Sequence, residues 1–492
     1  MSVPRTADVT TSLICAIAVA SGVALAQPSA TVSQRSLDDL RGDWLGVTRF
    51  SDGSELRFGL EILRKADGST GANVSIPDQG VAYIAVSTIK LEKDQLALRL
   101  DGPGLTIEGT VSEDRTTITG AGTQRGRSDP IVLRRASTLP PVGRERPQTP
   151  RPPFPYDTVE VAFQNPVDDV WLSGTLAKPT GQHGKFPAAI FVGGSGANQR
   201  DYDLDGHRLP AVIADYLARR GFAVLRYDKR GVYKSTGNYS AATDSDFARD
   251  AAAAYDYLLR RADIDHRKVG YIGHSQGSRV SATAVVLRGG AAGFVISMAG
   301  VGLNPIETLV LQDGAEMAAA GATTDEVSSL RDFSRKFYAT ALEELEQATR
   351  AAKLRALYDD LGGDYRDTVT RWYGEYGRKT YSLNVDVASR ETFVADKRQP
   401  APTVYWQRVR APVLVLNGGR DSQVPAADHV PAIVAALKDG RARRVDSRVF
   451  SELNHMFQTA KTGATDEYSE IDETIAPSVL QFIGDWLTEV LK

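Results

Sequence analysis

The sequence predicts an α/β fold: a mostly parallel, doubly wound sheet with a helical insertion, preceded by a small antiparallel β-barrel-like domain. Three observations predict it. Apolar strand patterns alternate with amphipathic helix patterns from about residue 155 onward. Residues 303–408 interrupt this alternation and carry no convincing pattern of a buried strand. Residues 36–136 show the short alternating runs and turn dipeptides of an antiparallel sheet. At 492 residues the chain is too long for one core, so we expect two or three domains.

The composition is ordinary for a globular protein, and the formal net charge is -3. So small a net charge creates no field that would attract nucleic acid or an anionic membrane surface. We therefore expect a small-molecule partner and no nucleic acid. The oligomeric state is left open by the sequence.

Residues 1–26 predict a secretory signal peptide. The apolar run "SLICAIAVASGVALA" follows Arg5 and ends on the small-x-small cleavage pattern "ALA". An uncleaved anchor is the alternative, but no basic stop-transfer cluster follows the run. Cys15, the only cysteine, lies inside this segment, so the processed chain would hold no disulfide, thiolate metal site or cysteine nucleophile. We expect a secreted or periplasmic protein without a stable membrane anchor.

Residues 36–136 predict a β-rich domain. In "SELRFGLEI" and "DQLALRL" every second residue is apolar, the pattern of a strand with one buried face. Asp-Gly pairs at 52–53, 67–68 and 101–102 supply the positive backbone angles that hairpin turns need. A small antiparallel barrel or sandwich follows from this pattern.

The opening "GDWLG" of this domain resembles the G-x-W start of lipocalin-like barrels. In such a barrel Arg134 or Arg135 on the last strand would stack on Trp44. Trp44 fits a core aromatic residue as well as it fits a ligand contact.

A proline-rich segment, residues 137–154, separates the two kinds of pattern. Its density of proline and charge cannot continue a helix or a sheet and favours an extended linker. The domain that follows, residues 155–302 and 409–492, alternates apolar strands with helices, which is typical of a parallel sheet covered on both faces. Residues 303–408, rich in Ala, Glu, Lys and Arg, predict a helical cap inserted into it.

One serine stands at a strand-to-helix turn in "KVGYIGHSQGSRVSA", residues 268–282. "KVGYIG" is a β-rich run, and Val280, Ala284 and Leu287 then recur at helical spacing. So sharp a turn strains the serine, and the glycines on both sides leave the room that it needs. The pattern predicts that Ser275 is a nucleophile above the sheet edge, with a helix N-terminus beneath it. A serine in an ordinary turn is the alternative.

A serine nucleophile needs a general base, and that base needs an acid to orient it. His455 follows the strand "RRVDSRVF", and Asp421 follows the strand "PVLVLN", so both should reach the sheet edge beside Ser275. The other five histidines stand at positions that disfavour this role. A loop histidine and a helix-capping aspartate are the alternatives. We predict Ser275 as nucleophile, His455 as base and Asp421 as acid.

Two backbone N–H groups are predicted to stabilise the negative oxygen of the intermediate. Gln276, the residue after the nucleophile, supplies one. Ser195, and after it Gly194, is the predicted second donor in the glycine-rich loop "VGGSGANQRD". A phosphate cradle is the alternative for these glycines, but their spacing opposes it. Arg200 and Asp201 fit either a polar contact to substrate or a salt bridge within the loop.

Together these segments resemble secreted bacterial α/β-hydrolases of the carboxylesterase and serine-aminopeptidase-like group, which are related to prolyl oligopeptidase catalytic domains. The resemblance covers about residues 155–490 and depends on "GSG-x-x-x-RD", "YD-x-RG-x-x-x-S", "GHSQG" and the loops of Asp421 and His455. It implies the α/β-hydrolase fold and a hydrolase activity, and members often carry a β-rich N-terminal domain. Tyr233 departs from the pattern, because it stands where the "RG-x-G" segment usually has glycine.

The predicted function is a serine hydrolase that cleaves carboxylic esters through an acyl-enzyme, with no metal and no organic cofactor. A serine peptidase or aminopeptidase is the first alternative, since the same triad cleaves amides when acidic cap residues anchor the substrate amine. A non-catalytic ligand-binding protein on a hydrolase scaffold is the second. The intact triad argues against that scaffold.

The cap carries a dense aromatic group: Trp372, Tyr373, Tyr376, Tyr381 and Trp406. Such residues either pack the cap's own core or line an acyl pocket over the nucleophile. If they line the pocket, Trp372 and Tyr376 are the predicted substrate contacts.

Overall fold

The computed structural model describes residues 36–49, 55–101, 104–124, 126–181, 184–360, 367–368 and 384–492. The chain divides into two compact units, which are unit 1 (Met1–Arg144 and Val232–Ser235) and unit 2 (Glu145–Gly231 and Thr236–Lys492). The predicted signal peptide lies outside the described residues. In the part of the chain that the structure describes, every helix falls short of the length and apolarity that a membrane crossing requires.

Unit 1 is a nine-stranded antiparallel sheet in its described residues, with the order β4-β3-β2-β1-β9-β8-β7-β6-β5. The strands are β1 (Gly42–Arg49), β2 (Glu55–Arg64), β3 (Thr70–Ile76), β4 (Val81–Ala85), β5 (Thr88–Glu92), β6 (Gln95–Leu100), β7 (Leu105–Val111), β8 (Thr117–Gln124) and β9 (Arg127–Ala136). Alternate residues such as Phe58, Leu60 and Ile62 meet in one buried cluster. The sheet therefore curls around a single apolar core, as the alternation predicts.

Trp44 of β1 lies inside this core. Its indole Nε1–H donates a hydrogen bond of 2.9 Å to the backbone carbonyl of Leu40. The guanidinium of Arg135 lies 4.7 Å from the centre of the indole ring, so Arg135 is the stacking partner and Arg134 is not. Because the ring is fully buried, Trp44 serves as a core residue of this unit.

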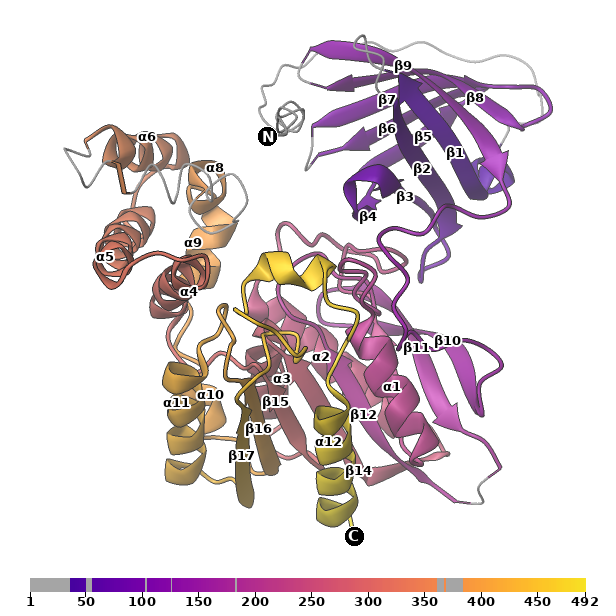
Figure 1. Ribbon diagram of the computed structural model, residues 1–492. Coiled ribbons are helices and arrows are strands. Elements are labelled where there is room, and N and C mark those ends of the chain that lie inside the picture. Colours follow the sequence, from indigo (N-terminus) through magenta and orange to yellow (C-terminus); the bar gives the residue numbers. More distant parts are fainter. Residues whose placement is uncertain are drawn as a thin grey trace, which may run out of the picture. The chain divides into compact units, whose positions relative to one another are not determined.

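Unit 2 contains an eight-stranded sheet in its described residues, with the order β10-β11-β13-β12-β14-β15-β16-β17 (Figure 1). The strands are β10 (Tyr156–Asn165), β11 (Val170–Pro179), β12 (Phe186–Val192), β13 (Ala223–Tyr227), β14 (Ile264–His274), β15 (Val295–Met298), β16 (Pro412–Gly418) and β17 (Arg444–Phe450). β10 and β11 are antiparallel to their neighbours, and the remaining pairs are parallel. The mostly parallel sheet confirms the predicted fold class.

Helices cover both faces of this sheet (Figure 1). They are α1 (Leu209–Arg219), α2 (Asp244–Leu259), α3 (Gln276–Leu287), α11 (Ala426–Asp439) and α12 (Pro477–Val490). In β12, Ala188 and Ile190 pack with α2, α3 and α11, whereas Ala189 and Phe191 pack with α1 and α12. Consecutive strand residues are thus buried on opposite faces, which explains why these strands are apolar throughout.

Between β15 and β16 the chain forms a helical cap. Its described helices are α4 (Pro305–Ala319), α5 (Thr324–Ala341), α6 (Gln347–Asp359), α8 (Val385–Ala388) and α9 (Glu391–Lys397), followed by α10 (Thr403–Trp406). Residues of α4, α5, α6 and α8 form a separate buried cluster, among them Leu330, Phe333 and Phe337. The cap therefore has a core of its own.

Two predictions for the cap's aromatic residues have different outcomes. Trp372 and Tyr376 lie outside the described residues, as do Tyr373 and Tyr381. For Trp406 both predicted roles are wrong, because its buried ring belongs to the apolar cluster of the main sheet, together with α11. The physical reason is that the chain has already returned to the sheet at α10, before β16 begins.

Candidate active site

Ser275 occupies a sharp turn between β14 and α3. Its backbone angles are φ 55° and ψ -123°, a strained combination for a residue with a side chain, which costs roughly 1–3 kcal/mol. The Ser275 N–H donates to the carbonyl of Met298 at 2.8 Å, which ties the turn to β15. A Cβ on Gly277 would lie 2.0 Å from the carbonyl oxygen of Val192, so only glycine fits there. The elbow that the sequence predicts is present, and 8% of Ser275 is exposed.

Asp421 and His455 form a buried hydrogen-bonded pair beyond the ends of β16 and β17. His455 Nδ1 lies 3.0 Å from Oδ1 and 2.9 Å from Oδ2 of Asp421. The backbone N–H groups of Gln423 and Val424 donate to Oδ1 of Asp421 at 2.9 and 2.7 Å. The carboxylate is therefore fixed, and it holds the proton of His455 on Nδ1, which leaves Nε2 as an acceptor.

His274, the residue before Ser275, packs against this pair. The ring centres of His274 and His455 are 4.8 Å apart, and His274 Nε2–H donates to the backbone carbonyl of His455 at 3.0 Å. Burial, with a smaller effect of His455, lowers the pKa of His274 to about 3. His274 is thus a neutral spacer that keeps His455 next to the elbow.

The glycine-rich loop after β12 lies against the nucleophile. A Cβ on Gly194 would come within 3.0 Å of Ser275 Cβ. The Gly194 N–H donates to the hydroxyl of Tyr202. The Gly194 carbonyl accepts from Lys229 Nζ and, at 3.1 Å, from Asn198 Nδ2. Both polar groups of Gly194 are therefore engaged inside the protein.

The backbone N–H groups of Ser195 and Gln276 have no acceptor among the residues that the structure describes. Gln276 is the first residue of α3, where helical N–H groups lack partners within the helix. Ser195 and Gln276 are thus free to donate to a ligand, whereas the Gly194 N–H would first have to leave Tyr202.

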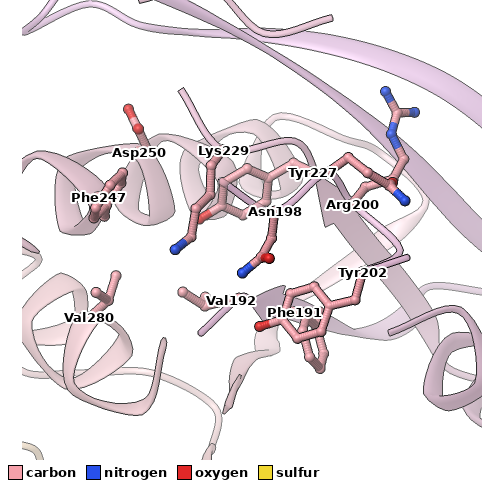
Figure 2. A pocket seen from close by; sticks show the side chains of 12 residues that line it. Phe191, Val192, Asn198, Arg200, Tyr202, Tyr227, Lys229, Phe247, Asp250 and Val280 are labelled. Carbon is pink, nitrogen blue, oxygen red and sulfur yellow. The ribbon is translucent and has the colours of Figure 1, made fainter. Parts of the chain in front are cut away.

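Arg200 is buried in an ion-pair network. Its guanidinium contacts Asp228 at 2.8 Å and Glu160 at 2.7 Å, and it also donates to hydroxyls on β11. Asp201 pairs with Arg226. Figure 2 shows the guanidinium of Arg200 turned away from the side chains at the centre of the view. This arrangement is the salt-bridge alternative that the sequence left open, and a contact between Arg200 and substrate stays a prediction.

Three polar side chains that the sequence did not single out meet beneath the glycine-rich loop. Figure 2 shows the Lys229 amine, the Asn198 amide and the Tyr202 hydroxyl directed toward one small cavity. Its volume of about 10 Å³ is room for about one water molecule, so it is too small for a substrate. Lys229 is the second residue after β13, and this position near the carboxyl end of the strand was the only signal of its role in the sequence.

Within the described residues no group of His, Cys, Asp and Glu side chains is arranged to hold a metal ion. The described contacts thus give a serine in a strained elbow, an imidazole oriented by a carboxylate and packed against the residue before that serine, and two backbone N–H groups without an acceptor among the described residues.

Comparison with known proteins places this site in a family. The family model described as X-Pro dipeptidyl-peptidase (S15 family) matches residues 151–455. This span exceeds half of the chain and includes Ser275, Asp421 and His455.

Similar individual proteins include esterases. Esterase EstD of Thermotoga maritima is 24% identical over 319 residues, a match that spans 65% of this chain and 66% of that esterase. A solved esterase of Pyrococcus furiosus is 17% identical, with a TM-score of 0.42 over 69% of this chain and 92% of its own. Est1E of Butyrivibrio proteoclasticus with bound ferulic acid is 15% identical, with a TM-score of 0.40 over 67% and 99%. The chain is a carboxylesterase-like α/β-hydrolase, and it belongs to the X-Pro dipeptidyl-peptidase (S15) family.

Proposed function

We propose that this protein is a serine esterase that cleaves carboxylic esters through an acyl-enzyme intermediate. One observation carries the proposal: a buried Asp421–His455 pair packs against His274, the residue that precedes a serine in a strained elbow. Such a pair activates a hydroxyl that is otherwise a poor nucleophile at neutral pH.

In the first half of the reaction the Ser275 oxygen attacks the ester carbonyl carbon, and its proton moves to Nε2 of His455. The carbonyl oxygen becomes negatively charged, and the N–H groups of Gln276 and Ser195 stabilise it. When the intermediate collapses, the bond to the alcohol oxygen breaks, and His455 returns the proton to the departing alcohol. Asp421 stays ionised and stabilises the imidazolium.

In the second half a water molecule attacks the acyl-enzyme while His455 accepts its proton. The same two N–H groups stabilise the second oxyanion. The acid is released when the proton passes from His455 to the oxygen of Ser275. The complete reaction converts ester and water into an alcohol and a carboxylic acid, so it consumes no oxidant and no other co-reactant.

A peptidase is the second candidate, because the family description names dipeptides ending in proline. Release of an N-terminal dipeptide needs carboxylates that anchor the substrate amine. Carboxylates in the acidic runs at residues 325–332 and 342–347 serve the cap itself, since Glu326 completes the capping box of α5, Glu346 is the N-cap of α6 and Glu343 pairs with Lys353. This use of the carboxylates favours the ester.

The test is Ser275→Ala in the purified protein. We expect hydrolysis of short-chain 4-nitrophenyl esters to fall by at least about 10⁴-fold, because only binding and oxyanion stabilisation remain. Covalent labelling by a fluorophosphonate should disappear. Ser281→Ala is the matched control, since Ser281 lies on the same helix and its hydroxyl only donates to the Gly277 carbonyl at 2.7 Å.

Two results would contradict the proposal. Undiminished labelling of Ser275→Ala would show that another residue is the nucleophile. Turnover of Gly-Pro-4-nitroanilide by the wild-type protein at a higher kcat/KM than any ester would favour the peptidase.

A further inference from the structure

We propose that Lys229 is a positioning residue that orients the Gly194–Ser195 peptide so that the Ser195 N–H serves the oxyanion. The inference deepens the proposed esterase function and rests on it. Lys229 itself touches neither the nucleophile nor the base in the contacts described above; it acts through the glycine-rich loop.

The first step is the geometry of one peptide group. The carbonyl of Gly194 and the N–H of Ser195 belong to the same planar trans unit, so they point in opposite directions. Lys229 and Asn198 both donate to that carbonyl. The Ser195 N–H must therefore point away from Lys229. A Cβ on Gly194 would lie 3.0 Å from Ser275 Cβ, so this peptide belongs to the part of the loop that faces the nucleophile, and we infer that its N–H is directed to the oxyanion position.

The second step is that Lys229 connects both oxyanion donors. Besides the Gly194 carbonyl, its ammonium contacts the Gly196 carbonyl at 3.3 Å and Oε1 of Gln276 at 3.2 Å. A lysine ammonium has three N–H donors, and here they have three acceptors. One charged group thus ties the loop after β12 to the first residue of α3, which are the two sources of the predicted oxyanion donors.

The third step is the environment that keeps this contact strong. Only 6% of Lys229 is exposed, and its amine lies 4.8 Å from the centre of the Phe247 ring. In such a setting a charge-assisted hydrogen bond is not weakened by competing water.

Charged groups from several helices face this amine. Asp244 of α2 and Asp396 of α9 favour its protonated form, and each of them also interacts with Arg279 of α3. Lys397 of α9 pairs with Asp396. Asp250 of α2 also lines the cavity, but it is neutralised by Arg230. The titratable hydroxyls of Tyr202 and Tyr239 complete the surroundings.

Burial outweighs these carboxylates and lowers the pKa of Lys229 to about 8. The amine is therefore charged at neutral pH and loses its proton as the pH rises beyond about 8. Loss of the charge weakens all three hydrogen bonds to the loop and to Gln276.

The experiment compares Lys229→Met with wild type on a short-chain 4-nitrophenyl ester and on its thiono analogue, in which sulfur replaces the carbonyl oxygen. Sulfur accepts hydrogen bonds poorly, so the thiono substrate gains little from a donor at the oxyanion site. We expect kcat for the ester to fall on the order of 10²-fold while KM changes by less than about threefold. The kcat for the thiono ester should change little. The ratio of kcat for the ester to kcat for the thiono ester should therefore be much lower in Lys229→Met than in wild type.

A pH profile gives a second readout. The wild-type kcat for the ester should decline above pH of about 8, and the profile of Lys229→Met should lack that decline. Lys438→Met is the matched control, because Lys438 is exposed at the end of α11 and should leave both ratio and profile unchanged.

The outcomes separate the inference from the proposed function. If Lys229→Met slows both substrates equally, or if its pH profile matches that of wild type, the lysine is merely structural and the inference is wrong. If Lys229→Met does not fold, Asn198→Ala removes the other donor to the Gly194 carbonyl and should show a smaller, equally selective loss for the ester. A wild-type protein that turns over neither substrate, or a Ser275→Ala variant that turns over both, overturns the proposed function and this inference with it.

Discussion

His429 illustrates how a buried residue near the site can affect stability without taking part in catalysis. It lies fully buried in α11, and its Nδ1 accepts a hydrogen bond of 3.0 Å from the N–H of Gly302, where the chain leaves the sheet for the cap. Nε2 is buried and has no partner among the described residues. Burial, only partly offset by the carboxylate of Asp421, lowers the pKa of His429 to about 4.

The pKa values of His429 and His274 predict acid sensitivity. The folded values of about 4 and about 3 lie below the value of ~6.5 of an unfolded histidine, so the unfolded chain binds protons that the folded chain does not. Stability is therefore lost as the pH falls from ~6.5 toward these folded values. We expect each histidine to cost about 1–2 kcal/mol of unfolding free energy between pH 7 and pH 5.

Urea unfolding at the two pH values checks this prediction. His429→Gln should lose less stability between pH 7 and pH 5 than wild type does, because one titrating group is gone. His266→Gln, at an exposed position, should behave as wild type. An equal pH dependence in His429→Gln and wild type would show that His429 does not titrate in this range.

At the scale of elements, the cap is held together by a core of aromatic rings and by hydrogen bonds to one buried carboxylate. The aromatic rings of Phe333 and Phe337 in α5 pack the cap's own core, and buried Asp313 accepts hydrogen bonds from Ser334 and Tyr338 at 2.8 and 3.0 Å. The described cap helices are therefore packed against one another around this core.

The prediction for the cap concerns Trp372 and Tyr376, which lie outside the described residues. If they line an acyl pocket, their replacement by alanine should shift the ratio of kcat/KM between short and long esters, since each methylene in an apolar pocket contributes on the order of 1 kcal/mol. Phe337→Leu is the control, because a change in the cap core should lower the melting temperature and leave the ratio unaltered. Alanine variants at positions 372 and 376 that behave like this control would exclude the pocket.

The proline-rich segment, residues 137–154, is a second element whose packing differs from what its composition suggests. Its composition predicts an extended linker, but from Glu145 onward the segment belongs to unit 2. Arg146 is almost fully buried there and donates to the backbone carbonyls of Asp205 and Ile471 at 2.9 and 2.6 Å. A charged residue in a sequence gives no sign that distant carbonyls will surround it.

At the scale of the whole molecule, the single cysteine and the absence of a metal cluster in the described residues lead to one prediction. EDTA and thiol-alkylating reagents should leave esterase activity within experimental error of the untreated protein, since the proposed mechanism needs neither a Lewis acid nor a thiol. The measurement is the initial rate on a 4-nitrophenyl ester after incubation and dialysis. Activity that is lost with EDTA and restored by a divalent cation would contradict the mechanism.

The sequence by itself determined the features that depend on local chemistry. Alternation of apolar residues predicts the strands of unit 1, because one face of each strand is buried. The glycines around Ser275 predict the elbow, because no other residue fits so tight a turn. The positions of Asp421 and His455 after consecutive parallel strands predict that they meet, since the ends of such strands lie at one edge of a sheet.

Only the tertiary structure decided the features that depend on which distant residues become neighbours. Trp406 packs in the main sheet, Arg200 is enclosed by Asp228 and Glu160, and Lys229 holds the Gly194 carbonyl. In each case residues from separate segments of the chain could have contacted the buried charge or ring, and the folded chain determines which of them do. Local periodicity does not contain that information, because burial strengthens whichever charge pairs the folded chain brings together and excludes the water that would otherwise satisfy them.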